Sequence, residues 1–266
     1  MTVRGAIIDL DGTVYRGGEL CNGTAAGVQS LREAGLDLLF FSNNPLKDGD
    51  DYVERLTEFG LDVSSGEACS SGVVTTEYLV ENHSEEQIFC IGADGLREQF
   101  RAADLDVTEE PETTDVLVAS WTSEFDFADM RDALAAVDDD TTFLGTDPDR
   151  TFPMEGGTEV PGSGAIIGSV AAVVGTDPDA ILGKPSKAAL DAALDRLDVA
   201  PSECLVVGDR LDTDLRMGDR AGMTTVLVLT GVSDRADIAD SDIQPDYVVD
   251  SLGGIDTVIE EITAAR

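Results

Sequence analysis

Apolar residues along the chain gather in short runs that alternate with stretches of helical spacing. The run Ala6-Ile7-Ile8 predicts a buried strand, and apolar residues at helical spacing predict a helix over 24–34. A second apolar run covers 36–42, and a second helical stretch covers 50–59. Strands that alternate with helices in this way predict a parallel sheet with helices on both faces.

The same alternation returns at the far end of the chain and, separately, in its middle. At the far end we predict a helix over 186–197 and strands over 204–207, 225–229 and 247–249. In the middle we predict strands over 87–91, 116–119 and 142–144, and helices over 97–102, 128–137 and 165–174. A complete pattern of about a hundred residues is large enough for a domain. We therefore predict an α/β protein whose core is formed by residues 1–74 and 183–266, with an α/β domain inserted over 75–182.

Charge narrows the choice of partners. The chain has 54 acidic and 17 basic residues, a formal net charge of -37, and the acidic residues are spread along it. Such a surface repels nucleic acid and anionic membranes, so we expect neither as a partner. At molar salt the Debye length falls to about 3 Å, which screens the repulsion within the protein. The composition therefore predicts adaptation to high internal salt; the alternative, a surface for a basic partner, would predict a clustered patch.

Targeting signals and cysteine pairs are not evident in the sequence. No apolar run reaches the roughly 20 residues that span a bilayer, and the first residues lack the apolar stretch of a signal peptide. We therefore expect a soluble, cytoplasmic protein, and the oligomeric state, including a homo-oligomer, stays open. No CxxC pair occurs and His83 is the only histidine, so we expect small buried thiols rather than a zinc site or disulfides. The cysteines are Cys21, Cys69, Cys90 and Cys204.

An acidic pair marks the end of the first predicted strand. Asp9 and Asp11 are two residues apart and Gly12 follows them. Residues i and i+2 of an extended chain point to the same side, here at the edge of a parallel sheet where ligands bind. One carboxylate can attack phosphorus while its neighbour moves a proton. The alternative is a simple turn, since Asp-Gly is a common turn dipeptide.

Two further loops carry groups that can bind a phosphoryl group. Ser42 and Asn43 follow the second predicted strand, where a hydroxyl and an N–H could hold phosphoryl oxygens or could simply form a helix cap or turn. Lys184 precedes a predicted helix, where its charge could neutralise the phosphate and the nucleophile. A lone lysine is otherwise most often a solvated surface residue.

A second acidic cluster follows the strand 204–207. Asp209, Asp212 and Asp214 lie just past this strand, and carboxylates placed there suit Mg²⁺. The alternative is an acidic loop in an acidic protein, which is a stronger objection for Asp212 and Asp214 than for Asp209. In order along the chain, we expect the acidic pair, the hydroxyl, the lysine and this cluster at four loops on one sheet edge.

With these motifs in this order, the chain resembles the haloacid dehalogenase superfamily of phosphohydrolases. The long insertion before Lys184 resembles the branch with a large α/β cap, the NagD-like and 4-nitrophenylphosphatase-like proteins. The resemblance covers essentially the whole chain, and it implies a three-layer, Rossmann-like parallel-sheet core with an inserted α/β cap domain. The matching motifs are Asp9-Leu10-Asp11-Gly12-Thr13, Ser42-Asn43, Thr146-Asp147-Pro148-Asp149, Pro161-Gly162-Ser163-Gly164, Gly183-Lys184-Pro185, Gly208-Asp209 through Asp214, and Ala221-Gly222-Met223-Thr224-Thr225.

The resemblance also implies a role for each motif residue. Asp9 would attack phosphorus and form an aspartyl-phosphate, and Asp11 would protonate the leaving group and then activate water. Asp9 and Asp209 would bind Mg²⁺ by their side chains and Asp11 by its backbone carbonyl, while Asp214 would orient the waters of the metal. The phosphoryl-binding residues would be Ser42, Asn43 and Lys184. Aspartate at the second motif position favours phosphate transfer to water over dehalogenation or phosphonate cleavage.

The expected activity is a Mg²⁺-dependent phosphatase for small phosphate monoesters, such as sugar phosphates. Two alternatives remain, a phosphate-binding or phospho-sensing protein without catalysis and a phosphotransferase to an acceptor other than water. The loop 147–164 would face the active site of this family. Its charged residues, Asp147, Asp149, Arg150 and Glu155, are candidates for specificity or are solvated loop charges. Trp121 would form its own contacts in the cap or, as we expect, belong to the core.

Overall fold

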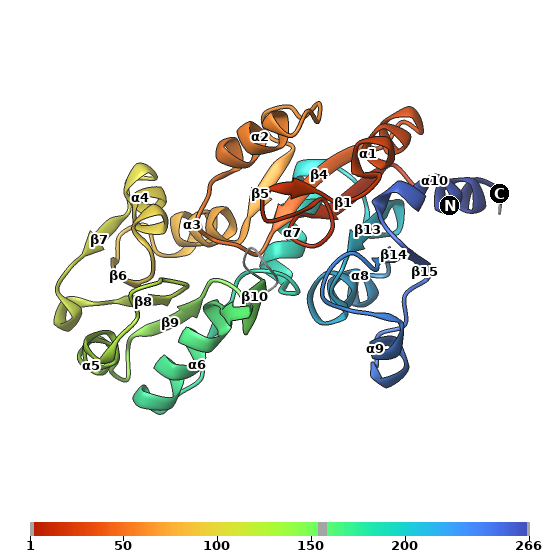
Figure 1. Ribbon diagram of the computed structural model, residues 1–266. Coiled ribbons are helices and arrows are strands. Elements are labelled where there is room, and N and C mark those ends of the chain that lie inside the picture. Colours follow the sequence, from red (N-terminus) through yellow and green to blue (C-terminus); the bar gives the residue numbers. More distant parts are fainter. Residues whose placement is uncertain (1–2, 154–158, 265–266) are drawn as a thin grey trace. The chain divides into compact units, whose positions relative to one another are not determined.

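The computed structural model describes residues 3–153 and 159–264 of the chain. The chain folds into two compact units (Figure 1). Unit 1 comprises Met1–Ser42, Gly49–Cys69 and Leu190–Arg266, and unit 2 comprises Asn43–Asp48 and Ser70–Ala189. Each unit is built around its own sheet flanked by helices, which confirms the predicted α/β class.

Unit 1 contains a six-stranded sheet with the order β15-β14-β13-β1-β4-β5. β1 pairs in parallel with both β4 and β13, so the carboxyl ends of these three strands share one edge. All residues of β1 and β13 are buried, which explains their unbroken apolar runs. The strands are β1 (Gly5–Asp9), β4 (Asp37–Ser42), β5 (Ala68–Ser70), β13 (Cys204–Gly208), β14 (Thr224–Val228) and β15 (Tyr247–Val249).

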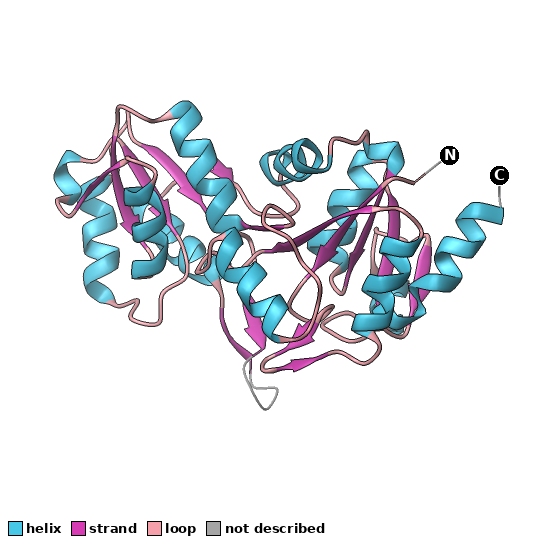
Figure 2. Ribbon diagram, turned by 90° about the horizontal axis from the view of Figure 1, so that it is seen from above, coloured by secondary structure: helices cyan, strands magenta, loops and turns pink. Residues whose placement is uncertain are grey.

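Helices cover both faces of this sheet (Figure 2). They are α1 (Thr24–Glu33), α2 (Gly49–Glu58), α7 (Lys187–Leu197), α8 (Arg216–Ala221), α9 (Arg235–Asp240) and α10 (Ile255–Ala264). Short helical turns add η3 (Pro201–Glu203), the π-helical η4 (Leu211–Leu215) and η5 (Leu252–Gly254). A small antiparallel hairpin, β2 (Tyr15–Arg16) and β3 (Glu19–Leu20), follows the loop after β1.

Unit 2 contains a five-stranded sheet with the order β12-β9-β8-β6-β7, in which all neighbouring strands are parallel. Its strands are β6 (Gln87–Ile91), β7 (Asp106–Thr108), β8 (Val116–Ala119), β9 (Thr142–Gly145) and β12 (Ala180–Ile181). The helical segments are α3 (Ser71–Asn82), α4 (Asp94–Ala102), η1 (Pro111–Thr113), α5 (Phe127–Ala136) and α6 (Ser163–Val174), and a hairpin is formed by β10 (Thr151–Pro153) and β11 (Glu159–Pro161). Leu117 and Phe143 of the sheet pack with Ile166 and Val170 of α6 in one apolar cluster.

The predicted strands and helices occur at nearly the predicted bounds, but the helices α8, α9 and α10 were not predicted. Nor was α3. Its first turns contain Gly72 and the β-branched residues 73–76, which are poor helix formers. A cap and burial offset this weakness. The Ser70 hydroxyl accepts a hydrogen bond from the Val73 N–H at 3.2 Å, and Leu79 is fully buried.

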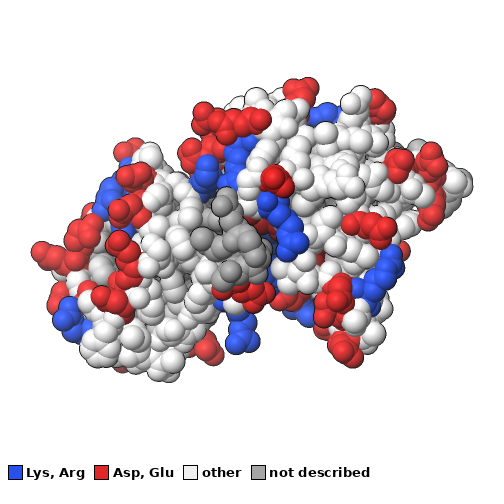
Figure 3. Space-filling view, viewed as in Figure 1, with Lys and Arg blue, Asp and Glu red and all other residues white. Residues whose placement is uncertain are grey.

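The four cysteines are free, as expected, but only three of them are buried. Burial raises the pKa of Cys90 and of Cys204 to about 12. Cys21 is partly exposed and departs from the expectation of buried thiols. On the face shown in Figure 3, acidic side chains lie over many elements rather than in one patch. None of the helices in the described part of the chain is long and apolar enough to cross a membrane.

Two glycines inside helices provide a test of the packing. A Cβ added at Gly27 of α1 would overlap the backbone of Leu252, whereas one added at Gly168 of α6 would meet nothing within 4 Å. We expect Gly27→Ala to lower the free energy of unfolding by about 1–3 kcal/mol through overpacking. Gly168→Ala should raise it by about 0.5–1 kcal/mol, because alanine favours the helix. Urea unfolding followed by circular dichroism measures both, and shifts of the same sign would contradict this packing.

Candidate active site

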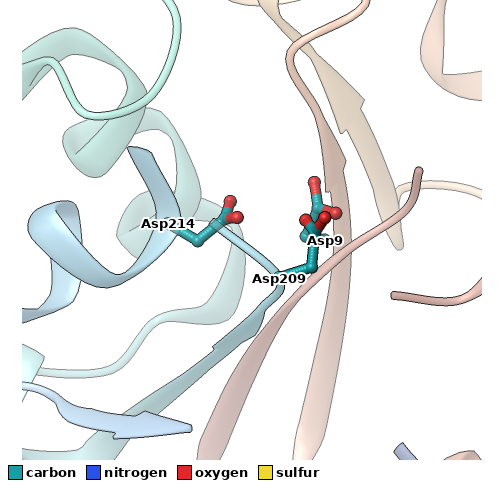
Figure 4. Close-up of side chains that lie close together, drawn as sticks. All are labelled: Asp9, Asp209 and Asp214. Atoms are coloured by element: carbon teal, nitrogen blue, oxygen red, sulfur yellow. The ribbon is translucent and has the colours of Figure 1, made fainter. Parts of the chain in front are cut away.

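Three buried carboxylates converge at the edge of the sheet in unit 1. Asp9 is the last residue of β1, Asp209 directly follows β13, and Asp214 lies in η4. Their relative exposures are 8%, 0% and 1%, and one carboxylate oxygen from each lies within 4.8 Å of the other two. Figure 4 shows Asp9 beside Asp209, with Asp214 facing them from the turn after β13. The parallel pairing of β1 with β13 places the first two side chains together.

The loop after β14 holds Asp209 in place. The Val232 N–H donates a hydrogen bond to Asp209 Oδ2 at 2.6 Å, and the Ser233 N–H donates one to its backbone carbonyl at 3.0 Å. A Cβ on Gly231 would overlap the Asp209 carboxylate, so only glycine leaves room for it. Asp209 Oδ1 is buried and accepts no hydrogen bond from the described residues. One oxygen is thus fixed, and the other is available to a ligand.

The electrostatics of the cluster favour a cation. Burial, and then the charges of Asp9 and Asp214, raise the pKa of Asp209 well above its usual range. When they are ionised, three buried carboxylates repel one another, and a bound cation would offset this repulsion. Carboxylate oxygens are the ligands that hard divalent cations such as Mg²⁺ prefer. The side chains present therefore fit a divalent metal ion.

The loop after β1 places Asp11 differently from Asp9. Gly12 adopts a φ of 96°, and a Cβ there would overlap the Asp209 carboxylate, so glycine is required twice over. Asp11 is exposed, and its side chain is not part of the carboxylate cluster found among the described residues. The Tyr15 hydroxyl donates a hydrogen bond to Asp11 Oδ2 at 3.4 Å. Tyr15 was not identified from the sequence, because nothing in the pattern relates it to Asp11.

Ser42, the last residue of β4, is buried and hydrogen-bonded. It is 2% exposed, and β4 pairs in parallel with β1, with Asp9 opposite Phe41. The side chain of Tyr52 in α2 shares a hydrogen bond with Ser42. Burial raises the pKa of Tyr52 above its usual value, so its hydroxyl stays protonated. Ser42 therefore lies at the same sheet edge as Asp9, as the sequence predicts.

Asn43 and Lys184 are linked within unit 2. Asn43 Oδ1 accepts a hydrogen bond from the Lys184 N–H at 2.8 Å, and Asn43 Nδ2 donates one to the Lys184 carbonyl at 3.0 Å. Lys184 is 1% exposed, which excludes a solvated surface lysine. It follows β12, a strand of the five-stranded sheet. Lys184 lies in the loop between β12, which was not predicted, and α7. Its place beside the other three loops stays a prediction.

Asp212 and Asp214 differ in burial. Asp214 is buried in the carboxylate cluster, which excludes a solvated loop residue. Asp212 is largely exposed, and its carboxylate pairs with Arg210 at 3.2 Å. The acidic-loop alternative therefore holds for Asp212 alone.

A second polar group lies in the loop after β9. Asp147 is 2% exposed; it accepts hydrogen bonds from the Thr146 hydroxyl at 3.0 Å and the Asp149 N–H at 3.2 Å, and it bonds the Ser163 side chain. Burial, and then the charge of Asp149, raise the pKa of Asp147 to about 8. Asn43 Nδ2 also lies 3.5 Å from Asp149 Oδ1. Asp147 is thus a buried acid and not a solvated loop charge.

Two further candidates, Arg150 and Trp121, are at least partly exposed. Arg150 is exposed, and Glu155 lies outside the described residues. Trp121 is partly exposed, donates a hydrogen bond to the Pro161 carbonyl at 3.1 Å and packs edge-on against Phe152. The expectation that Trp121 belongs to the core is therefore wrong, since it packs on the β10–β11 hairpin.

The raised pKa of Asp147 predicts a pH-dependent stability. An unfolded aspartate loses its proton near pH 4, whereas folded Asp147 keeps it up to about pH 8. The folded state therefore binds more protons in this window, and its stability falls as pH rises from about 4 to 8. We expect Asp147→Asn to flatten this slope and to raise the free energy of unfolding at pH 8 by about 1–3 kcal/mol.

Thermal melts of both proteins from pH 4 to 8 measure the effect. Asp139→Asn, an exposed acid of the same unit, should keep the wild-type pH dependence. Parallel melting curves for Asp147→Asn and wild type would mean that Asp147 is ionised when folded.

Comparisons with known proteins agree with this geometry. A profile of the haloacid dehalogenase-like hydrolases matches residues 6–106, and a related HAD-hydrolase-like profile matches 181–255. Sugar-phosphatase AraL of Bacillus subtilis is 30% identical over 97% of this chain and 93% of its own length. The acid sugar phosphatase of Staphylococcus epidermidis is 34% identical over 91% of this chain and 92% of its own.

Solved structures lead to the same family. The p-nitrophenyl phosphatase from Archaeoglobus fulgidus superimposes with a TM-score of 0.90 at 34% identity, covering 97% of this chain and all of that one. NagD from E. coli K-12 gives a TM-score of 0.84 at 27% identity, over 95% of this chain and 98% of that one. The glycerol phosphate phosphatase Rv1692 from Mycobacterium tuberculosis, in complex with magnesium, gives a TM-score of 0.83 at 28% identity, over 94% of this chain and 75% of that one.

These similarities confirm the predicted NagD-like branch and support a phosphoric monoester hydrolase. On the extent of these matches and the buried acidic cluster that accompanies them, the chain belongs to the haloacid dehalogenase-like hydrolases.

Proposed function

We propose that this protein is a Mg²⁺-dependent phosphatase that hydrolyses small phosphate monoesters through an aspartyl-phosphate on Asp9. The observation that carries the proposal is the buried cluster of Asp9, Asp209 and Asp214 at the carboxyl edge of a parallel sheet. Ligands of open α/β sheets bind at this edge. The surface charge of -37 disfavours nucleic acid and anionic membranes, which leaves a small ester as the expected ligand.

The metal site that we assign consists of the Asp9 and Asp209 side chains with the Asp11 backbone carbonyl. Asp214 would orient the waters of the ion. The buried Asp209 Oδ1 supports this assignment, because it lacks a hydrogen-bond donor among the described residues. When bound, Mg²⁺ would offset the negative charge of the carboxylates and of the phosphoryl oxygens.

Asp9 and Asp11 divide the chemistry between them. Asp9 forms a bond to phosphorus while the ester P–O bond breaks, and Asp11 gives its proton to the leaving oxygen. Asp11, now a carboxylate, takes a proton from water as that water attacks the phosphorus of the aspartyl-phosphate. Inorganic phosphate leaves, Asp9 is restored, and Asp11 is protonated again. The exposure of Asp11 supports its role, because both the leaving alcohol and the water must reach it.

We assign the binding of the transferring phosphoryl group to Ser42, Asn43 and Lys184. Ser42 ends β4, and Asn43 follows it directly. The two hydrogen bonds from Asn43 to the Lys184 backbone support a shared role for these residues. A fixed cation next to a phosphoryl group stabilises the charge of the transition state.

Unit 2 contains the proposed cap domain, for which the sequence predicts the range 75–182. A cap suits small substrates, because it excludes water from the bound ester. The names of the sugar phosphatases among the relatives make sugar phosphates the first esters to test. Asp149 and Arg150 remain candidates for contacts with the substrate.

The proposed mechanism predicts the effect of removing the nucleophile. In molar KCl with Mg²⁺, the wild type should release phosphate from 4-nitrophenyl phosphate, and chelation of the metal should stop the release. We expect Asp9→Asn to lower kcat at least about 1,000-fold, because the amide cannot attack phosphorus. Asp212→Asn is the matched control, since Asp212 is exposed and pairs with Arg210. It should keep wild-type activity.

Full activity of Asp9→Asn would rule out the covalent mechanism. A stable aspartyl-phosphate without turnover on any ester would instead indicate a phospho-sensing protein. Transfer of the phosphoryl group to an added alcohol in preference to water would indicate a phosphotransferase.

We also propose that the protein works in a salt-rich cytoplasm, as its charge of -37 suggests. The Debye length falls from about 10 Å at 0.1 M salt to about 3 Å at 1 M, which weakens repulsion between surface carboxylates. The melting temperature should therefore rise with KCl, most steeply at the low end of the range. A melting temperature that does not change between 0.1 and 2 M KCl would refute the adaptation.

A further inference from the structure

The hydroxyl of Tyr15 is buried beside the exposed carboxylate of Asp11. Tyr15 is 0% exposed, and its O–H donates to Asp11 Oδ2 at 3.4 Å. The backbone fixes the two residues as well. Asp11 and Tyr15 form an isolated bridge, and the Gly12 N–H donates to the Tyr15 carbonyl at 2.8 Å. The donor therefore cannot move far from Asp11 while the loop stays folded.

The ring of Tyr15 is held from two sides. Its centroid lies 5.6 Å from that of Phe59, and the Arg55 guanidinium lies over the ring at 4.2 Å. Arg55 also donates a hydrogen bond to the Gly17 carbonyl at 2.7 Å, in the turn that follows β2. The ring and the hairpin that carries it are thus anchored to the same side chain.

We propose that Tyr15 is a positioning residue for Asp11, which it holds through Oδ2 so that Oδ1 can exchange protons with the leaving group and with water. The proposal rests on the proposed function, in which Asp11 is the general acid and base. Proton transfer needs the acid within about 2.6–3.2 Å of the reacting oxygen, so the fixed rotamer matters to the rate.

The leaving group reveals whether Asp11 is well placed. 4-Nitrophenolate departs as a stable anion and needs little help from an acid, whereas the alkoxide of glycerol needs a proton as it leaves. The value of kcat/KM reports the steps up to the first irreversible one, which is transfer to Asp9. A misplaced Asp11 therefore lowers kcat/KM for glycerol 3-phosphate far more than for 4-nitrophenyl phosphate.

The test compares Tyr15→Phe with the wild type on these two esters, in molar KCl with Mg²⁺. Phenylalanine keeps the ring between Phe59 and Arg55 and removes only the hydroxyl. We expect kcat/KM for glycerol 3-phosphate to fall at least about 10-fold more than kcat/KM for 4-nitrophenyl phosphate. Tyr78→Phe is the matched control, because Tyr78 packs on His83 in unit 2. It should leave both values unchanged.

Asp11→Asn separates failure of this inference from failure of the proposed function. Asp11→Asn should lower kcat/KM for glycerol 3-phosphate selectively. If it does, but Tyr15→Phe lowers kcat/KM equally for both esters or for neither, Tyr15 has no positioning role and the proposed function stands. If Asp11→Asn is not selective, both the acid role of Asp11 and the inference are overturned. If Tyr15→Phe does not fold, Arg55→Met replaces it. A fall in kcat/KM confined to glycerol 3-phosphate then supports the positioning role, and an equal fall for both esters overturns it.

Discussion

Three carboxyl groups are buried within a few ångströms of one another, and the backbone around them leaves room for their side chains. Asp9, Asp209 and Asp214 are each less than a tenth exposed. Such burial is unfavourable without a compensating charge. A side chain on Gly12, Gly208 or Gly231 would overlap the carboxylate of Asp209 or Asp214. These three glycines, from three separate parts of the chain, thus leave room for the carboxylates.

Asp9 and Asp11 are only two residues apart, but their surroundings differ. Asp9 ends a strand that is buried throughout, so its carboxylate shares the crowded cluster. Asp11 lies past the strand end, is exposed, and receives a hydrogen bond from Tyr15 instead. In the mechanism that we propose, these two carboxylates have different tasks, and the difference in their surroundings is of the kind that commonly separates an acid from a nucleophile.

Sequence patterns predicted what depends on local order and missed what depends on contacts at long range. Buried strands are continuous apolar runs, so the strand ends that carry Asp9, Ser42 and Asp209 could be placed. α3 could not, because packing and a cap outweigh its weak helix propensity. The two-residue strand β12 gave no periodic signal, so the strand that precedes Lys184 was missed. No local pattern separates Asp212 from Asp214, since only folding buries one and exposes the other.

Salt and a bound cation act on different charges of this protein. Mobile ions screen carboxylates at the surface, where most of the 54 acidic residues of a folded chain must lie. They do not reach Asp209, whose Oδ1 is buried without a donor among the described residues. Raising the salt concentration therefore weakens the repulsion between surface carboxylates and leaves the repulsion within the buried cluster unchanged. Compensation of the cluster has to come from protons, protein groups or ions within the site, so the Mg²⁺ requirement that we propose should persist in molar salt.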